Sequence, residues 1–90
     1  MPETRKYILR VVVPARDLKR VEKALETVKT KGCLSFYSKR IKHFDVRRDL
    51  DSLEFVYLLV LSRDDERKLR EMFSRILQGT IGFFLLYVVE

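Results

Sequence analysis

Three segments of the chain are apolar at odd and even positions alike, and this feature limits the possible folds more than any other. The segments are KYILRVVVP (residues 6–14), LEFVYLLVL (residues 53–61) and the apolar end of QGTIGFFLLYVVE (residues 78–90). Their β-branched and aromatic residues favour strands. Because neighbouring side chains of a strand point to opposite faces, a sheet built from these segments would be apolar on both faces. Each face therefore needs a cover.

Two other segments have the residue spacing of amphipathic helices. The first covers about residues 17–30, with Asp17 as the predicted N-cap and Gly32 just beyond its end. The second follows Ser62, because SRDD places a carboxylate three residues after the cap, and it ends before Gly79. The residues predicted to form its buried stripe are Leu69, Met72, Phe73, Ile76 and Leu77.

A further strand is predicted to begin at Cys33, which makes the element order β-α-β-β-α-β. This order is typical of an α+β, ferredoxin-like sandwich, in which two helices cover one face of a four-stranded antiparallel sheet. Residues 1–90 suffice for a single domain. The second face of such a sheet is largely polar in a monomer, whereas here it is apolar. We therefore expect copies of the chain to pack sheet against sheet.

The composition favours a cytoplasmic protein. Cys33 is the single cysteine and cannot form a disulfide within the chain, which is typical of a reducing compartment. No apolar run approaches the ~20 residues that cross a bilayer, and no secretory signal is visible at the N-terminus. We therefore expect no membrane association. The absence of Asn and the 36% of charged residues are typical of a thermophile.

The sequence has no recognisable catalytic or metal-binding pattern. His43 is the only histidine, whereas a protein zinc site needs three or four ligands, so we interpret it as a surface residue. Cys33 has no histidine near it in sequence, and we expect it to serve packing. Neither a phosphate-loop motif nor a dinucleotide-binding fingerprint occurs. The expectation is a non-enzymatic protein without a cofactor.

Two segments suit an anionic ligand, in keeping with the net charge of +6. SKRIKHFDVRR (residues 38–48) contains Lys39 and Arg40, whose side chains suit phosphate groups; the alternative is a solvated hairpin. QGTIG (residues 78–82) has two glycines that let backbone N–H groups approach a ligand. Its alternative is a helix C-cap followed by a strand-entry glycine.

Four stretches make the chain resemble the PII nitrogen-regulatory signalling proteins and their smaller PII-like relatives. LKRVEKAL (residues 18–25) resembles the first helix of that family, and ALETVKTKG (residues 24–32) resembles its helix-to-strand junction. LEFVYLLVLSRDDERKLREMFSRI (residues 53–76) resembles the third strand and second helix. GTIGFFLLYVVE (residues 79–90) is similar to the glycine-bearing loop and the last strand.

The resemblance implies a compact PII-like regulator with a shortened loop, as a homotrimer rather than a dimer, with its sheets turned towards the threefold axis. Another subunit would then cover Phe83, Phe84 or their neighbours. The resemblance also implies a small anionic ligand, such as an adenine nucleotide, bound between subunits. The residues that match the family's ligand-binding positions are Lys39, Arg40, Gly79, Thr80 and Gly82.

Other hypotheses stay open. A nucleic-acid-binding ferredoxin-like protein would use the basic hairpin at residues 39–48, and its binding would weaken steeply with salt. A stand-alone dimeric ligand-sensing domain would also pack sheet to sheet. A cofactor-free enzyme with His43 as its base is the last alternative.

Overall fold

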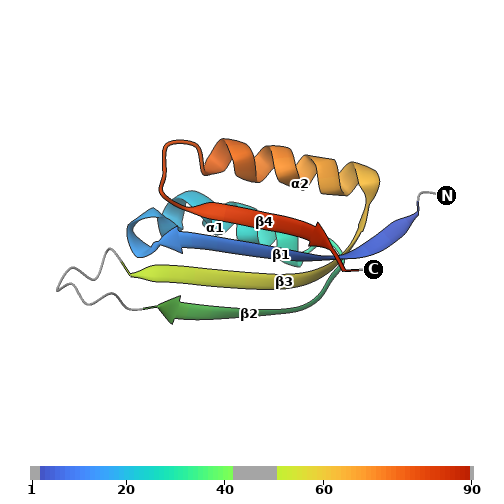
Figure 1. Cartoon of the computed structure of the whole chain (residues 1–90), viewed down its shortest axis with the longest axis horizontal. Helices are drawn as coiled ribbons and strands as arrows, with labels where there is room; N and C mark the ends of the chain where they lie inside the picture. The colour runs from blue at the N-terminus through green and yellow to red at the C-terminus, as the bar shows by residue number, and fades with distance from the viewer. Residues whose placement is uncertain (1–2, 42–50, 90) are drawn as a thin grey trace.

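The computed structural model describes residues 3–41 and 51–89. Its elements are β1 (Thr4–Pro14), the 3₁₀ helix η1 (Ala15–Asp17), α1 (Leu18–Lys29), β2 (Cys33–Ile41), β3 (Ser52–Ser62), α2 (Arg63–Ile76) and β4 (Phe83–Val88) (Figure 1). The predicted β-α-β-β-α-β order is confirmed. The first strand begins two residues earlier than its apolar run, since Thr4 and Arg5 still pair with β3.

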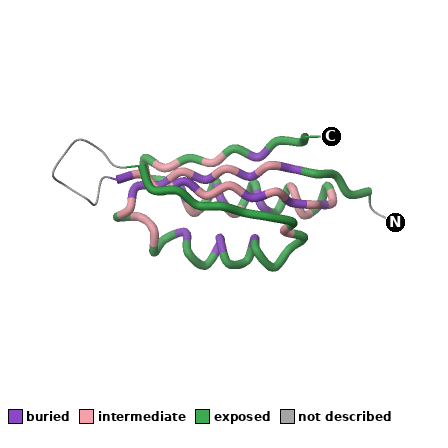
Figure 2. The backbone as a smooth tube through the Cα atoms, turned by 90° about the horizontal axis from the view of Figure 1, so that it is seen from below, coloured by how far each residue is buried: buried purple, intermediate pink, exposed green. Residues whose placement is uncertain are grey.

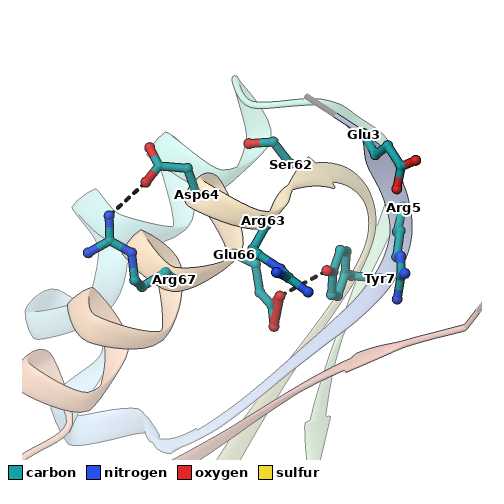
Figure 3. A pocket seen from close by; sticks show the side chains of 8 residues that line it. All are labelled: Glu3, Arg5, Tyr7, Ser62, Arg63, Asp64, Glu66 and Arg67. Atoms are coloured by element: carbon teal, nitrogen blue, oxygen red, sulfur yellow. Dashed lines mark hydrogen bonds and ion pairs between the residues drawn. The ribbon is translucent and has the colours of Figure 1, made fainter. Parts of the chain in front are cut away.

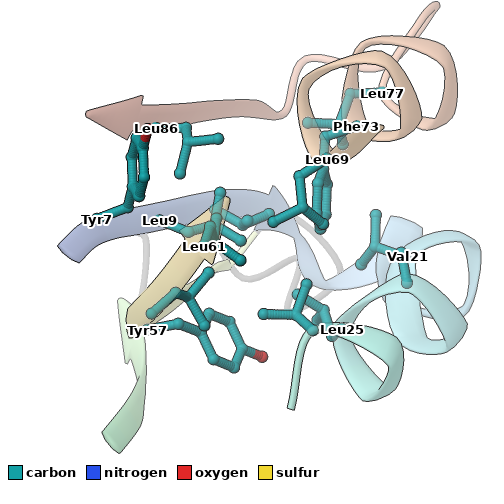
Figure 4. Packing of buried hydrophobic residues seen from close by; sticks show 14 of the residues in the cluster. Tyr7, Leu9, Val21, Leu25, Tyr57, Leu61, Leu69, Phe73, Leu77 and Leu86 are labelled. Carbon is teal, nitrogen blue, oxygen red and sulfur yellow. The ribbon is translucent and has the colours of Figure 1, made fainter. Parts of the chain in front are cut away.

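The strands form one antiparallel sheet in the order β2-β3-β1-β4. β1 and β3 are therefore the central strands, and β2 and β4 are the edges. Both helices lie on the same side of the sheet, as the view along the core shows (Figure 4). The predicted ferredoxin-like α+β sandwich is confirmed by this arrangement.

The hydrophobic core lies between the sheet and the two helices, and the alternation of the central strands fills it. The buried residues of the central strands include Tyr7, Leu9, Val11, Val13, Tyr57, Leu59 and Leu61. Those of the helical layer are Val21, Ala24, Leu25, Val28, Leu69, Phe73 and Leu77. Buried backbone follows the centre of the sheet, whereas the outer strands are mostly exposed (Figure 2). One row of side chains on each central strand thus faces the helices.

The two helices begin differently. Ser62 caps α2 as predicted, because its Oγ accepts a hydrogen bond from the Asp65 N–H at 3.2 Å. Asp17 takes the predicted N-cap position of α1, but its side chain makes no capping hydrogen bond there. The 3₁₀ helix explains the difference, since the N–H of Leu18 already donates to the carbonyl of Ala15. At the start of α1 a backbone carbonyl therefore accepts from a free N–H group, whereas at the start of α2 the serine hydroxyl does so.

Two glycines close the helices with left-handed backbone conformations, Gly32 at φ 64° and Gly79 at φ 83°. The carbonyl oxygen of Gly32 accepts a hydrogen bond from the Val60 N–H at 2.9 Å. A Cβ at Gly32 would collide with the carbonyl oxygen of Val60, whereas a Cβ at Gly79 would meet open space. Gly32 therefore allows a close backbone approach to β3 as well as a turn, and Gly79 serves only the turn.

These two positions make a matched pair of alanine substitutions. Gly79→Ala should lower the free energy of unfolding by about 1–2 kcal/mol, because only the left-handed backbone is strained. Gly32→Ala should lower the free energy of unfolding by more than ~3 kcal/mol, the upper end for ordinary substitutions. The reason is that the new Cβ also pushes the turn at Gly32 away from β3. Urea denaturation followed by circular dichroism measures both values. Equal losses in the two variants would show that the contact with Val60 is unimportant.

Candidate functional site

The face of the sheet opposite the helices is apolar, and we call it the open face. Directly paired residues of neighbouring strands share a face, so the register groups Ile8 with Leu58 and Tyr87. The apolar members of the open face include Ile8, Val12, Tyr37, Val56, Leu58, Phe83, Leu85 and Tyr87. Those on the edge strands, Tyr37, Phe83, Leu85 and Tyr87, are 45–56% exposed.

The size of the open face indicates a function. Four strands about 4.8 Å apart, each contributing about six residues at a rise of about 3.3 Å, cover roughly 400 Å². Apolar patches of this size on a soluble protein are often interaction sites. The chain thus has the apolar second face that its sequence predicts.

One residue expected on this face lies elsewhere. Phe84 points towards α2, where its ring packs against Phe73 with the ring centroids 5.7 Å apart. Phe83 belongs to the open face, because it pairs with Val12 on β1. The strict alternation of β4 separates the two neighbours, so a partner subunit on the open face could cover Phe83 but not Phe84.

An ion pair lies in the middle of the open face. Arg10 on β1 donates from Nε to Oε2 of Glu54 on β3 at 2.6 Å, and its Nη2 lies 2.5 Å from the same oxygen. The guanidinium carbon is also 5.9 Å from the centre of the Phe83 ring. Glu54 is only 8% exposed, so its charge depends on Arg10. Removal of Arg10 would leave a poorly solvated carboxylate, which is strongly destabilising, whereas the Arg10 side chain is 38% exposed and would be solvated without Glu54.

β2 places Lys39 and Arg40 on opposite faces of the sheet. Lys39 pairs in register with Glu54, on the open face, and Arg40 pairs with Leu53. The Nε of Arg40 donates to Oδ2 of Asp51 at 3.0 Å, and Asp51 is buried. A phosphate group that approached Arg40 would therefore compete with a carboxylate that is already in place.

The second predicted segment forms a compact turn between α2 and β4. The hydroxyl of Thr80 donates to the carbonyl of Leu77 at 2.9 Å and accepts from the N–H of Gly82 at 3.0 Å. A Cβ at Gly82 would lie 2.9 Å from the carbonyl oxygen of Val12. The glycines and Thr80 thus have roles in the turn and in the strand entry, whatever else they bind.

The described residues of the two predicted segments do not meet within one subunit. Both lie at the same end of the sheet, because Arg40 pairs with Leu53 near the start of β3 and β4 begins opposite Val12. They are on opposite edges, however, with β3 and β1 between them. Three strand spacings amount to about 14 Å. His43 and the other basic residues of the hairpin, Lys42, Arg47 and Arg48, lie outside the described residues.

A cavity of about 660 Å³ lies beside the start of α2 and was not expected from the sequence. Figure 3 shows it between the first residues of β1 and the first turn of α2, with Tyr7 at its side. Its lining residues are Glu3, Arg5, Tyr7, Ser62, Arg63, Asp64, Glu66 and Arg67. Acidic and basic groups alternate around it, and Arg67 already contacts Asp64 at 2.6 Å. The mixture favours neither an anion nor a cation.

A tyrosine–carboxylate pair forms part of this cavity. The hydroxyl of Tyr7 donates to Oε1 of Glu66 at 2.9 Å, and Nη2 of Arg70 lies 3.1 Å from Oε2 of the same carboxylate. The hydrogen bond from Tyr7 is the main reason that the pKa of Glu66 lies below its ordinary value, and Arg70 adds to it. Burial, followed by Glu66, raises the pKa of Tyr7. The pair therefore joins β1 to α2 only while Glu66 is charged and Tyr7 is neutral.

The Tyr7→Phe substitution should show this linkage in the pH dependence of stability. A lowered carboxylate pKa contributes stability above the unfolded-state pKa, and that stability is lost as the pH falls through the folded-state pKa. A raised tyrosine pKa contributes below its unfolded-state value and is lost at higher pH. The stability gap between wild type and variant should therefore be largest near neutral pH, and shrink below the ordinary glutamate value of 4.5 and above the ordinary tyrosine value of 10.0. Urea unfolding across the pH range measures it; a constant gap would contradict the assignment.

Three further observations concern the described residues. Neither helix has the length and apolar character of a bilayer-spanning segment. Among the described residues, 3–41 and 51–89, no group of three or more His, Cys, Asp and Glu side chains is placed to hold a metal ion. Cys33 packs against the edge of the core.

Comparison with known proteins gives the fold and no family. No family model matches the sequence, and no curated protein matches it either. A protein of unknown function from Galdieria sulphuraria is similar in structure, with a TM-score of 0.76 and 15% identity over 100% of this chain. The chain spans 52% of the length of that protein.

Two smaller structures are also similar. An uncharacterized protein from Thermotoga maritima has a TM-score of 0.70 and 17% identity, over 98% of this chain and 100% of that one. The C-terminal domain of the MgtC protein from Mycobacterium tuberculosis has a TM-score of 0.60 and 13% identity, over 96% and 88% of the two chains. None of the three is described as a PII protein. At these identities the likeness extends to the fold alone.

Proposed function

We propose that the chain is a non-enzymatic regulatory protein that works as a homo-oligomer, assembled by packing the open faces of its copies together. The open face is the observation that carries this proposal. Full burial of one large apolar side chain contributes about 1.5–3 kcal/mol. At least eight apolar side chains on each copy therefore suffice to offset the roughly 4–15 kcal/mol that association costs in lost freedom of motion.

The central ion pair suits a specific assembly. Arg10 and Glu54 already satisfy each other within one subunit, so burial at an interface would leave neither charge without a partner. A charged pair within an apolar surface disfavours arrangements that would separate it or place like charges opposite each other. We infer that the pair fixes the orientation in which two open faces meet, while the apolar residues around it supply the attraction.

A trimer of the PII-like kind is the form of assembly that we propose. In such a trimer an anionic ligand lies between subunits, and this would resolve the separation of the two predicted segments. Lys39 would come from one copy, and the turn with Gly79, Thr80 and Gly82 from its neighbour. An adenine nucleotide is the ligand class that the resemblance implies.

The assembly is tested by charged substitutions on the open face. Leu85→Asp and Tyr87→Asp replace side chains that are 47% and 49% exposed in the single chain, so both variants should fold. Loss of ~1.5 kcal/mol of apolar burial corresponds to a roughly tenfold weaker association, and a buried carboxylate weakens it further. Light scattering after size-exclusion chromatography should give a trimer for the wild type and smaller particles for the variants.

Thr27→Asp is the matched control, because Thr27 is exposed on α1, on the helical side of the sheet. It should leave the particle mass unchanged. A wild-type dimer would favour the stand-alone dimeric ligand-sensing domain instead. A wild-type monomer at high concentration would refute the proposal.

Nucleotide binding is tested separately with ATP as the probe. If the ligand lies between copies, ATP at millimolar concentration should raise the melting temperature of the wild type. Leu85→Asp should lose this response although Lys39 and Gly82 are intact, and Lys39→Ala should weaken it without dissociating the particle. An unchanged melting temperature in an assembled wild type would reject the nucleotide and keep the oligomer. A full response in the dissociated variant would place the ligand within one subunit.

A further inference from the structure

The hydroxyl of Tyr57 is an unpaired polar group inside the protein. Tyr57 is on β3 and is fully buried, and in the part of the chain that the structure describes its hydroxyl has no hydrogen-bond partner. No other buried side-chain nitrogen or oxygen among these residues lacks a hydrogen-bond partner. Buried polar groups are almost always paired. An exception at the end of a rigid ring therefore calls for an explanation.

The ring aims the hydroxyl away from the centre of the core. Figure 4 shows Tyr57 extending from β3 towards α1, with its oxygen at the far end near Leu25. Burial raises the pKa of Tyr57 to about 12, and Cys33 and Glu26 add to this effect. The phenol is therefore neutral near pH 7 and has a proton to donate. What it lacks is an acceptor.

Tyr57 lines a groove between α1 and the strands β2 and β3. Its volume is about 220 Å³. Apolar side chains from three elements line it, namely Leu18 and Leu25 from α1, Phe36 from β2 and Phe55 from β3. Phe36 is half exposed and stacks on the ring of Tyr57, with the ring centroids 5.8 Å apart. The groove thus has an apolar wall, while the unpaired hydroxyl of Tyr57 is closed to solvent. A ligand therefore reaches this donor by displacing a lining side chain, and the half-exposed Phe36, which stacks directly on Tyr57, is the one placed to move.

The charged groups at the mouth of the groove restrict what can enter. Glu22 and Glu26 line it, and two carboxylates disfavour an anion. Lys29 contributes the cation, because its Nζ lies 3.8 Å from Glu26 and 4.3 Å from the centre of the Phe36 ring. A second ammonium group could pair only with the exposed carboxylate of Glu22 unless it displaced Lys29 from both contacts, and an exposed ion pair contributes little to binding. The charges therefore favour a neutral ligand.

We propose that this groove binds a small neutral molecule with an apolar, ring-sized body and a carbonyl-type acceptor, which takes the hydrogen bond from Tyr57. The size agrees, since a cavity of about 150 Å³ suffices for benzene, and 220 Å³ leaves room for a small polar substituent. The groove is on the helical side of the sheet, opposite the open face. The inference is therefore independent of the proposed assembly.

Nuclear magnetic resonance titration of the ¹⁵N-labelled full chain tests the proposal with three probes of similar size. Benzamide has the neutral carbonyl acceptor, toluene lacks it, and benzylamine carries a positive charge. Benzamide should shift the amide signals of residues 18–29 and 33–38, and bind at least about fivefold more tightly than toluene, as expected for one neutral hydrogen bond. Benzylamine should bind more weakly than benzamide.

Tyr57→Phe is the decisive variant, because it removes only the hydroxyl. An unpaired hydroxyl adds nothing to folding, so the variant should unfold at the same urea concentration or a higher one. It should bind benzamide and toluene equally. Tyr87→Phe is the matched control, since Tyr87 is on the open face, and it should keep the preference for benzamide. Ser38→Leu should block the groove from its exposed rim and abolish binding of every probe.

Three results would overturn the proposal. The first is the absence of signal shifts along the groove with any probe. The second is a preference for benzamide that persists in Tyr57→Phe. The third is a clear loss of stability in Tyr57→Phe, which would show that a bound water or a neighbouring side chain already pairs with the hydroxyl in solution.

Discussion

Two helices can cover only one face of a four-stranded sheet, and the rest of the structure depends on this limit. The core forms from one row of side chains on each central strand, such as Leu9 and Leu59, together with the buried faces of α1 and α2. The other row, with Ile8 and Leu58, has no helix over it in the part of the chain that the structure describes. A sheet that is apolar on both faces therefore forms a core on one side and leaves an exposed apolar surface on the other. That exposed surface leads to the proposed assembly.

The ion pair of Arg10 and Glu54 makes the open face less apolar at its centre. It interrupts the apolar residues at the centre of the sheet, where a nonspecific contact would otherwise be easiest. Each partner comes from a different central strand, so the pair also joins β1 to β3 on the outer side. Charged residues within exposed sheets are a known protection against unwanted association. The same two residues thus hold the subunit together and limit what may pack against it.

Much of the fold could be predicted from the sequence, because the apolar patterns and the SRDD cap are local signals. The sequence did not show which row of side chains on each strand faces the helices, since both rows are apolar. Arg10 and Glu54 are the residues that mark the outer row, and their positions on facing strands reveal it only once the register is known. Phe83 and Phe84 are distinguished in the same way. The candidate sites were harder to predict than the fold. The ion pair of Arg40 with Asp51 and the unpaired hydroxyl of Tyr57 result from packing, and neither has a sequence signature.

The topology also determines when the chain can fold. β1 is made before any of its partners, and it pairs with β3 and β4, which come after α1 and β2. An apolar strand with no available neighbour is prone to aggregate. During synthesis, this segment must therefore wait for strands from the second half of the chain, and contacts between such distant segments slow folding. The central position of β1 thus leaves its apolar residues without strand partners until β3 has emerged from the ribosome.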